Sequence, residues 1–190
     1  MSDEPPALRL AGTIRAGRTG LTDRFATLEG LTAWVREQDL SPYLDTAAFT
    51  ADEAVRAQVV ELRQAVRALF ARLVAPAPPS RADADALPPF DQALALLNRA
   101  ASPVLRQLRW QDEPREEFTP TVDGTAARLT AALADAAIGF FTDPIADQVR
   151  VCPAPRCVLY FVKRHPRQEW CSIACGNRAR AARHYHQHHR

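Results

Sequence analysis

The chain has 190 residues, of which 47% are hydrophobic and 24% are charged, and its 24 lysines and arginines outnumber its 22 acids by only two. This composition is typical of a globular protein with one moderate core and room for a small second module. No stretch reaches the roughly 20 apolar residues that span a bilayer, and the first residues carry no apolar signal stretch. We therefore expect a cytoplasmic protein with no membrane partner.

Residues 1–148 are predicted to form a mainly helical domain. Near its start, the alternation of Leu8, Arg9 and Leu10 indicates a buried turn or a strand. A first helix is expected from Thr27 and should stop before Pro42, because a proline disfavours helix in the residue that precedes it. The inward face of this helix would be formed by apolar residues at helical spacing: Leu28, Leu31, Trp34 and Val35.

A second helix is predicted where Thr50 and Glu53 match a capping box, and Pro76 should end it. Its apolar residues recur at the helical period: Val55, Val59, Leu62, Val66, Leu69, Phe70 and Leu73. The proline-rich segment 75–80 is expected to be an extended, exposed connector, and a short helix should follow Pro89.

The rest of this domain is predicted as a β-hairpin or an exposed loop over 104–110 and 116–122, and then a long helix over 123–141 that ends ahead of Pro144. The fold class is therefore mainly α: a helical N-terminal domain with at most a small β-hairpin, followed by a distinct C-terminal segment, 149–190.

All four cysteines lie in this C-terminal segment, with the spacing C-x4-C, thirteen residues, and C-x3-C. Each pair can turn two thiolates toward one point, and the stretch between the pairs is long enough for a hairpin. We expect a structural Zn²⁺ site, because four sulfurs fill the zinc tetrahedron and leave no open position. The alternative, two disulfides, would need an oxidising compartment. The expected ligands are Cys152, Cys157, Cys171 and Cys175.

The residues around the cysteines predict a small treble-clef-like finger. The β-branched and aromatic run over 158–162 favours a strand of a short hairpin. Ser172 is a suitable N-cap for a helix, in which Cys171 and Cys175 would project from one face of the first turn.

Charge divides the chain into two unlike parts. Residues 150–190 hold nine lysines and arginines against one acid, a net +8, whereas residues 1–149 carry 15 and 21, a net −6. A basic module on an acidic body is expected of a phosphate-binding surface. One arc of the last helix, with the basic residues after the hairpin strand, supplies the expected DNA contacts: Lys163, Arg164, Arg167, Asn177, Arg180, Arg183 and His184. The alternative is that this arc is only a solvated helix face.

Two residues of this helix have another predicted role. Arg178 lies closer to the cysteine face, so its guanidinium is expected to brace the finger by bonding hairpin carbonyls or the acidic domain. Asn177 lies two residues after the expected ligand Cys175, and its amide is as well suited to orienting the metal loop as to contacting DNA.

The C-terminal segment resembles the CGNR zinc finger, which it matches at Trp170-Cys171-Ser172 and at Cys175-Gly176-Asn177-Arg178. The resemblance implies zinc on the four cysteines and DNA binding in a bacterial transcription regulator. Many members of that family carry an acidic residue where this chain has Lys163 and Arg164.

The N-terminal domain is similar to the ABATE domain, through the stretch from Phe25 to Trp34 and the helix around Leu62. The resemblance implies a stress-induced transcription regulator. Family members often begin with Asp-x-x-Asn-Thr, whereas this chain has Arg9 and Gly12 ahead of Thr13.

The predicted function is a zinc-dependent, DNA-binding transcription regulator whose body senses a small-molecule effector or forms a homodimer. The alternative is a zinc-stabilised protein-interaction module whose basic face docks on an acidic surface. Catalysis is not expected, because no phosphate-binding glycine loop is present, no cysteine lies outside the finger, and no histidine precedes His165.

Overall fold

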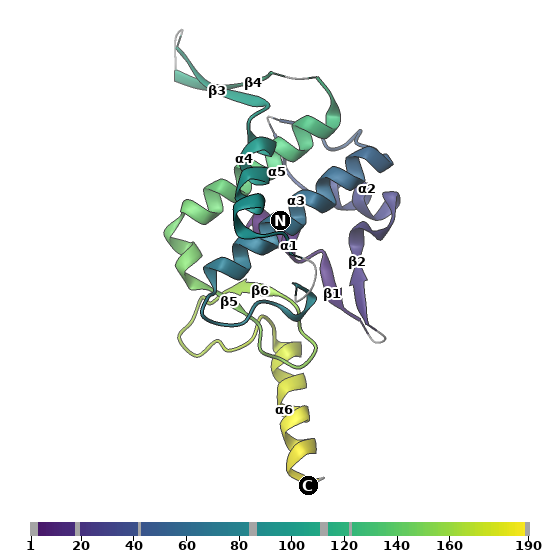
Figure 1. Cartoon of the computed structure of the whole chain (residues 1–190), viewed down its shortest axis with the longest axis vertical. Coiled ribbons are helices and arrows are strands. Elements are labelled where there is room, and N and C mark those ends of the chain that lie inside the picture. The colour runs from purple at the N-terminus through teal and green to yellow at the C-terminus, as the bar shows by residue number, and fades with distance from the viewer. Residues whose placement is uncertain are drawn as a thin grey trace.

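The computed structural model describes residues 4–17, 20–41, 43–83, 87–110, 114–121 and 123–188. A helical body occupies most of the chain, and a finger with a long terminal helix projects from one end of it (Figure 1). The prediction of a mainly helical fold with a small hairpin and a C-terminal finger is confirmed. No helix in the described ranges is both long and apolar enough to cross a bilayer.

The body is built around α3 (Glu53–Leu73), which packs most extensively against three other helices. These neighbours are α1 (Pro6–Ala11), α4 (Phe90–Ala101) and α5 (Thr125–Thr142). The predicted apolar stripe of α3 is buried, because its 3.6-residue period aligns those side chains toward the same neighbours. The predicted helix over 123–141 corresponds to α5, whose inward face is equally apolar.

The first helix of the prediction is α2 (Leu28–Arg36), which ends before the expected limit at Pro42. The Thr27 hydroxyl accepts a hydrogen bond from the Gly30 N–H and so caps its start. Trp34 is buried in the core, as predicted, and its ring meets Phe25 edge to face at 5.2 Å between centroids.

Three local predictions are corrected by the structure. The segment around Leu8 and Leu10 is the helix α1, because both leucines point into the core from a helix that begins at Pro6. The N-cap of α3 is Asp52, whose carboxylate accepts from the Val55 N–H at 2.8 Å, and Thr50 is exposed. The proline-rich segment 75–80 is not wholly an exposed connector, because its last residue, Ser80, is buried.

Two antiparallel hairpins lie outside the helical core. The predicted hairpin over 104–122 is present as β3 (Val104–Trp110) and β4 (Pro114–Pro120), and it projects from the end of the body opposite the finger (Figure 1). Val122, the last residue of the predicted strand, lies outside the described residues. A shorter hairpin, β1 (Ile14–Ala16) with β2 (Leu21–Asp23), is followed by the turn η1 (Arg24–Ala26).

The chain passes from α5 through the turn η3 (Pro144–Gln148) into the finger. The finger consists of β5 (Val149–Val151), β6 (Tyr160–Val162) and α6 (Ile173–His188). The predicted strand therefore pairs with residues ahead of the first cysteine, and Cys152 and Cys157 lie in the loop between the two strands. As a result, the first pair of cysteines is held at the turn of a hairpin.

Candidate metal centre

The four cysteines converge on one point, and their sulfur atoms all lie within 4.8 Å of one another. The Sγ of Cys171 is 3.7 Å from that of Cys157 and 3.5 Å from that of Cys175. Sulfurs at a zinc bond length of about 2.3 Å on a tetrahedron are about 3.8 Å apart, whereas a disulfide needs about 2.05 Å. The thiols are therefore free and spaced for one tetrahedral metal ion.

The hairpin turn positions the first pair of ligands. The Cys152 N–H donates to the Leu159 carbonyl at 2.9 Å, and the Cys157 N–H donates to the Ala154 carbonyl at 2.9 Å. Arg156 takes the left-handed conformation, with φ at 64°, and this turn directs the next residue back toward Cys152. Both sulfurs of the pair consequently face the same side of the loop.

The start of α6 positions the second pair. The Ser172 hydroxyl accepts from the Cys175 N–H at 3.2 Å, so the predicted N-cap is confirmed. The Cys171 N–H also points at the Cys152 sulfur, 3.5 Å away, and joins the two pairs through a backbone donor. The helix start and the hairpin turn thus hold the four ligands from opposite sides.

The thiols perturb one another strongly. Hydrogen bonds from Cys157 and Cys171 lower the pKa of Cys152 to about 2, while the bond to Cys152 raises the pKa of Cys157 to about 11 and that of Cys171 well above its ordinary range. One thiolate therefore suppresses ionisation of its neighbours, because repeated negative charge in a half-buried cluster is unfavourable. A divalent cation removes that conflict, and the ligand set fits a metal ion.

The centre is closed by apolar side chains, with Ala154 and Phe161 buried beside the cysteines and Trp170 packed against them. A Cβ on Gly176 would lie 3.2 Å from the Trp170 ring, so the absence of a side chain there admits the indole. Four sulfur ligands in such a shell leave no position for a reacting water. The arrangement suits a structural metal.

Around the centre, Arg178 donates to the Pro155 carbonyl in the loop of the first cysteine pair at 3.1 Å. Asn177 accepts from the Arg180 guanidinium at 2.5 Å, and that guanidinium lies 5.9 Å from the Trp170 ring centroid. The exposed side chains among the predicted DNA contacts are Arg164, Arg167, Asn177, Arg180, Arg183 and His184, with Lys163 partly exposed. Figure 1 shows α6 leading away from the body, so no element of the body covers its basic arc.

Sequence reasoning missed the polar network that joins the finger to the body. Arg67 of α3 is completely buried, and it donates to the Asp83 carboxylate at 2.5 Å and to the Val158 carbonyl in the finger at 3.2 Å. The Tyr160 hydroxyl donates to the same carboxylate at 2.7 Å. The signal in the sequence was an arginine on the apolar face of α3, since such a residue is rarely buried without a partner.

These features define a class: a helical body fused to a closed, four-cysteine metal-binding finger. Residues 4–144 match the ABATE family model, described as "Putative stress-induced transcription regulator", and residues 148–188 match the CGNR zinc finger. The chain belongs to the ABATE family and ends in a CGNR zinc finger, so both predicted resemblances are confirmed. No curated protein matches it.

Proposed function

We propose that this protein is a DNA-binding transcription regulator, in which Zn²⁺ on the four cysteines shapes the finger and α6 contacts the duplex. The observation that carries the proposal is the placement of the basic arc, which projects from the body on a helix anchored to the metal centre (Figure 1). The matched families, a transcription regulator and a zinc finger, support the same function. No part of the metal centre suits catalysis.

The zinc would act by fixing the root of α6. Its ligand Cys175 lies in the first turn of that helix, and the centre sets the direction in which Arg180 and Arg183 extend. The basic arc would neutralise phosphates, and Asn177 and Arg180 are residue types that also bond base edges. Their mutual hydrogen bond presents both side chains together on one exposed surface.

The alternative function is docking of the basic face on an acidic protein. Docking of the basic arc of α6 on the chain's own acidic body is not the arrangement of this structure, because α6 points away from the body (Figure 1). An external acidic partner remains the second candidate, and the excess of basic residues in the finger favours it as much as it favours DNA.

The proposal is tested by titrating the zinc-loaded protein into a random-sequence duplex and a genomic fragment library at two salt concentrations. We expect the variant with Arg180→Ala and Arg183→Ala to bind about 10-fold or more weakly and to lose about two units of the slope of log affinity against log salt. The matched control, Arg81→Ala with Arg99→Ala, removes two exposed charges from the body and should bind as the wild type does. Equal affinities of wild type and finger variant at low salt would contradict the proposal.

A further inference from the structure

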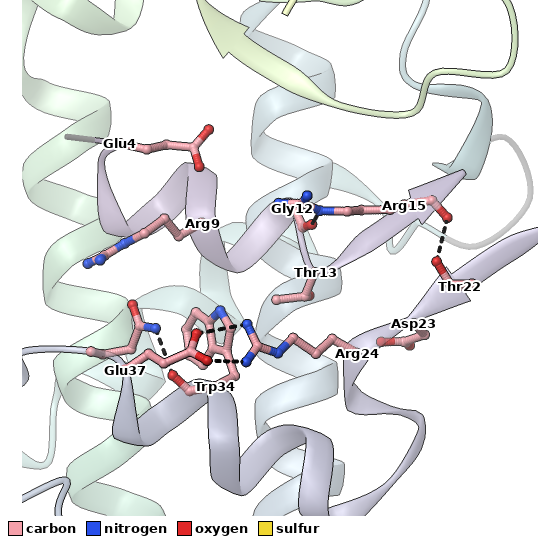
Figure 2. A pocket seen from close by; sticks show the side chains of 11 residues that line it. Glu4, Arg9, Gly12, Thr13, Arg15, Thr22, Asp23, Arg24, Trp34 and Glu37 are labelled. Carbon is pink, nitrogen blue, oxygen red and sulfur yellow. Dashed lines mark hydrogen bonds and ion pairs between the residues drawn. The ribbon is translucent and has the colours of Figure 1, made fainter. Parts of the chain in front are cut away.

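A cleft of about 610 Å³ lies in the body between α1, the β1–β2 hairpin and α2 (Figure 2). Glu4 and Arg9 lie on the α1 side of the cleft, and Arg24, Trp34 and Glu37 lie on the opposite side. Cavities of about 300–1,000 Å³ that combine apolar and polar walls are typical of small-molecule sites. Arg9 of α1 and Gly12, which follows that helix, both line it.

Two buried polar atoms in this cleft have no hydrogen-bond partner. The Nε of Arg9 is one, and its guanidinium makes no hydrogen bond or ion pair with any described residue. Gln38 is the other: the side chain is only 6% exposed, its Nε2 donates to the Trp34 carbonyl at 2.7 Å, and its Oε1 accepts nothing. An unpaired buried donor and an unpaired buried acceptor are each costly, so a ligand that satisfied both would gain from both.

Three other charged residues of the cleft already have ion-pair partners. Arg24 binds both carboxylate oxygens of Glu37, at 2.9 and 2.6 Å, and Asp23 binds the buried Arg63 from below. Arg9 and Arg15 are the lining arginines without a carboxylate partner among the described residues, and Arg15 is exposed and donates from its Nε to the Gly12 carbonyl at 3.1 Å. We place the anion on Arg9, because its Nε is buried and unpaired and its planar fork matches a carboxylate. Glu4, the lining acid without an ion pair to a described residue, would repel a doubly charged phosphate more strongly than a singly charged carboxylate.

We propose that this cleft binds a small α-hydroxy or α-amino carboxylate, with the carboxylate on Arg9 and the hydroxyl or ammonium group donating to Gln38, and that its occupancy changes DNA binding by the finger. The second part rests on the proposed function. Binding of the carboxylate in the cleft involves only the body, and it can be tested without DNA.

Helix α3 connects the cleft to the finger. Arg63 donates to Thr13 at 3.1 Å and to Asp23, and both of these residues line the cleft. One turn further along, Arg67 donates to the Ala11 carbonyl at the end of α1 and to the Val158 carbonyl in the finger. A ligand that shifts α1 against α3 therefore acts on groups that also hold the finger, which gives the two sites a shared element.

The binding test uses calorimetry on the zinc-loaded, full-length protein with lactate, mandelate and glutamate at concentrations up to about 10 mM, which detects affinities down to the millimolar range. Two further compounds isolate the proposed contacts: mandelamide lacks the carboxylate, and phenylacetate lacks the α-hydroxyl. We expect at least one of the three acids to bind, and mandelamide and phenylacetate to bind at least about 10-fold more weakly than mandelate if mandelate is the acid that binds. Binding by none of the acids would overturn the proposal, as would equal or tighter binding of inorganic phosphate.

The residue assignment is tested with Arg9→Gln and Arg9→Lys. We expect Arg9→Gln to weaken the bound acid by about 10-fold or more, and Arg9→Lys to restore part of the affinity because it keeps the charge without the fork. Arg99→Gln is the matched control, since it removes an exposed arginine from α4. Wild-type affinity in Arg9→Gln, with its melting temperature unchanged, would sink the assignment.

The coupling is tested by repeating the DNA titration with the cleft saturated. We expect a change in DNA affinity of about fivefold or more in the wild type and none in Arg9→Gln. If the acid binds but does not change the DNA affinity, the proposed coupling is wrong, while the proposed ligand site in the cleft stands. Acid binding in a protein that binds no DNA would instead overturn the proposed function.

Discussion

Tyr160 belongs to the finger by sequence, but its side chain is part of the body. The hydroxyl donates to Asp83 and accepts from the Ser80 N–H at 3.2 Å, and the ring stacks on Phe70 of α3 at 5.2 Å between centroids. Burial and then the charge of Asp83 raise the pKa of Tyr160 well above its ordinary value, so the group remains a donor at physiological pH. One side chain thus closes the polar network on the finger side.

Tyr160→Phe tests that network. The change keeps the ring and removes one donor from a fully buried carboxylate, so we expect a loss of about 1–3 kcal/mol in the free energy of unfolding of the zinc-loaded protein. Urea denaturation followed by circular dichroism measures it. Tyr185→Phe is the control, because Tyr185 is 60% exposed and its change should stay within about 0.5 kcal/mol. Equal losses in the two variants would show that the network contributes nothing of its own.

Asp23 makes stability depend on pH. Burial alone would raise its pKa, but the hydrogen bonds from Arg63 and Phe25, with the charges of Arg63 and Arg56, bring the pKa below the ordinary value of 3.8. A lowered carboxyl pKa stabilises the fold above the unfolded-state value and ceases to do so as the pH falls through the folded-state value. The stabilisation from Asp23 should therefore be complete at neutral pH and decline below about pH 4.

Asp23→Asn isolates this contribution. We expect the variant to be less stable than the wild type at pH 7, and the gap between their urea midpoints to narrow as the pH falls below about 4. Comparing the two proteins at each pH cancels the loss of metal on acidification, because the cysteines are the same in both. If the difference between the two urea midpoints stayed constant down to pH 3, the charge of Asp23 would contribute nothing to stability through Arg63.

Among the elements, α3 makes specific interactions both at its N-terminus and along one face. Its start is capped by Asp52, and Arg63 and Arg67 project from one face to bind the cleft and the finger. The spacing of four residues places both guanidinium groups on the same side of the helix. The helix is therefore both the core of the body and the link between its two sites.

Asp52→Ala tests the corrected N-cap. Loss of the carboxylate that accepts from Val55 should lower the free energy of unfolding by about 1 kcal/mol. Thr50→Ala, two residues earlier, should have almost no effect, because Thr50 is exposed and lies before the helix. Thermal or urea unfolding of both variants decides between the two caps, and a larger loss in Thr50→Ala would restore the capping box.

At the scale of the whole molecule, the finger and the body share one core. Val149, Tyr160 and Val162 of the β5–β6 hairpin are buried in the same apolar cluster as the body helices, whereas the cysteines form a separate small cluster with Phe161 and Trp170. The hairpin therefore presents one face to the body and holds the metal ligands in its turn. Loss of order at the metal centre should therefore also destabilise the part of the body against which this hairpin packs.

Metal removal tests this connection. We expect a chelator to increase hydrogen exchange at the amides around Arg67 and Phe70 in α3, because the hairpin that covers them loses its anchored turn. The amides of α2, which lies near the N-terminal end of α3 and away from β5 and β6 in Figure 1, should exchange as before. Unchanged exchange in α3 after complete metal loss would show that the body folds independently of the finger.

The local features of this protein are predictable from its sequence. Helical periodicity identified α2, α3 and α5, and the spacing of Cys152, Cys157, Cys171 and Cys175 identified the metal centre, because these signals are carried by residues close together in the chain. The ends of the helices and the existence of α1 were harder to predict from the sequence. Thr50 and Asp52 are both good N-caps, and Leu8 with Leu10 suits either a strand or a short helix.

The contacts between segments that are distant in the chain are known only from the folded structure. No local pattern indicates that Arg67 reaches Val158, that Ser80 is buried, or that Arg9 and Gln38 leave a donor and an acceptor unpaired in one cleft. The hydrogen-bond partners of a buried polar group depend on which segments pack around it. Leaving such a group unpaired costs free energy only when water is excluded from it. The two sites are therefore predictable to different degrees: the metal centre from its ligands, the cleft only from the packing around it.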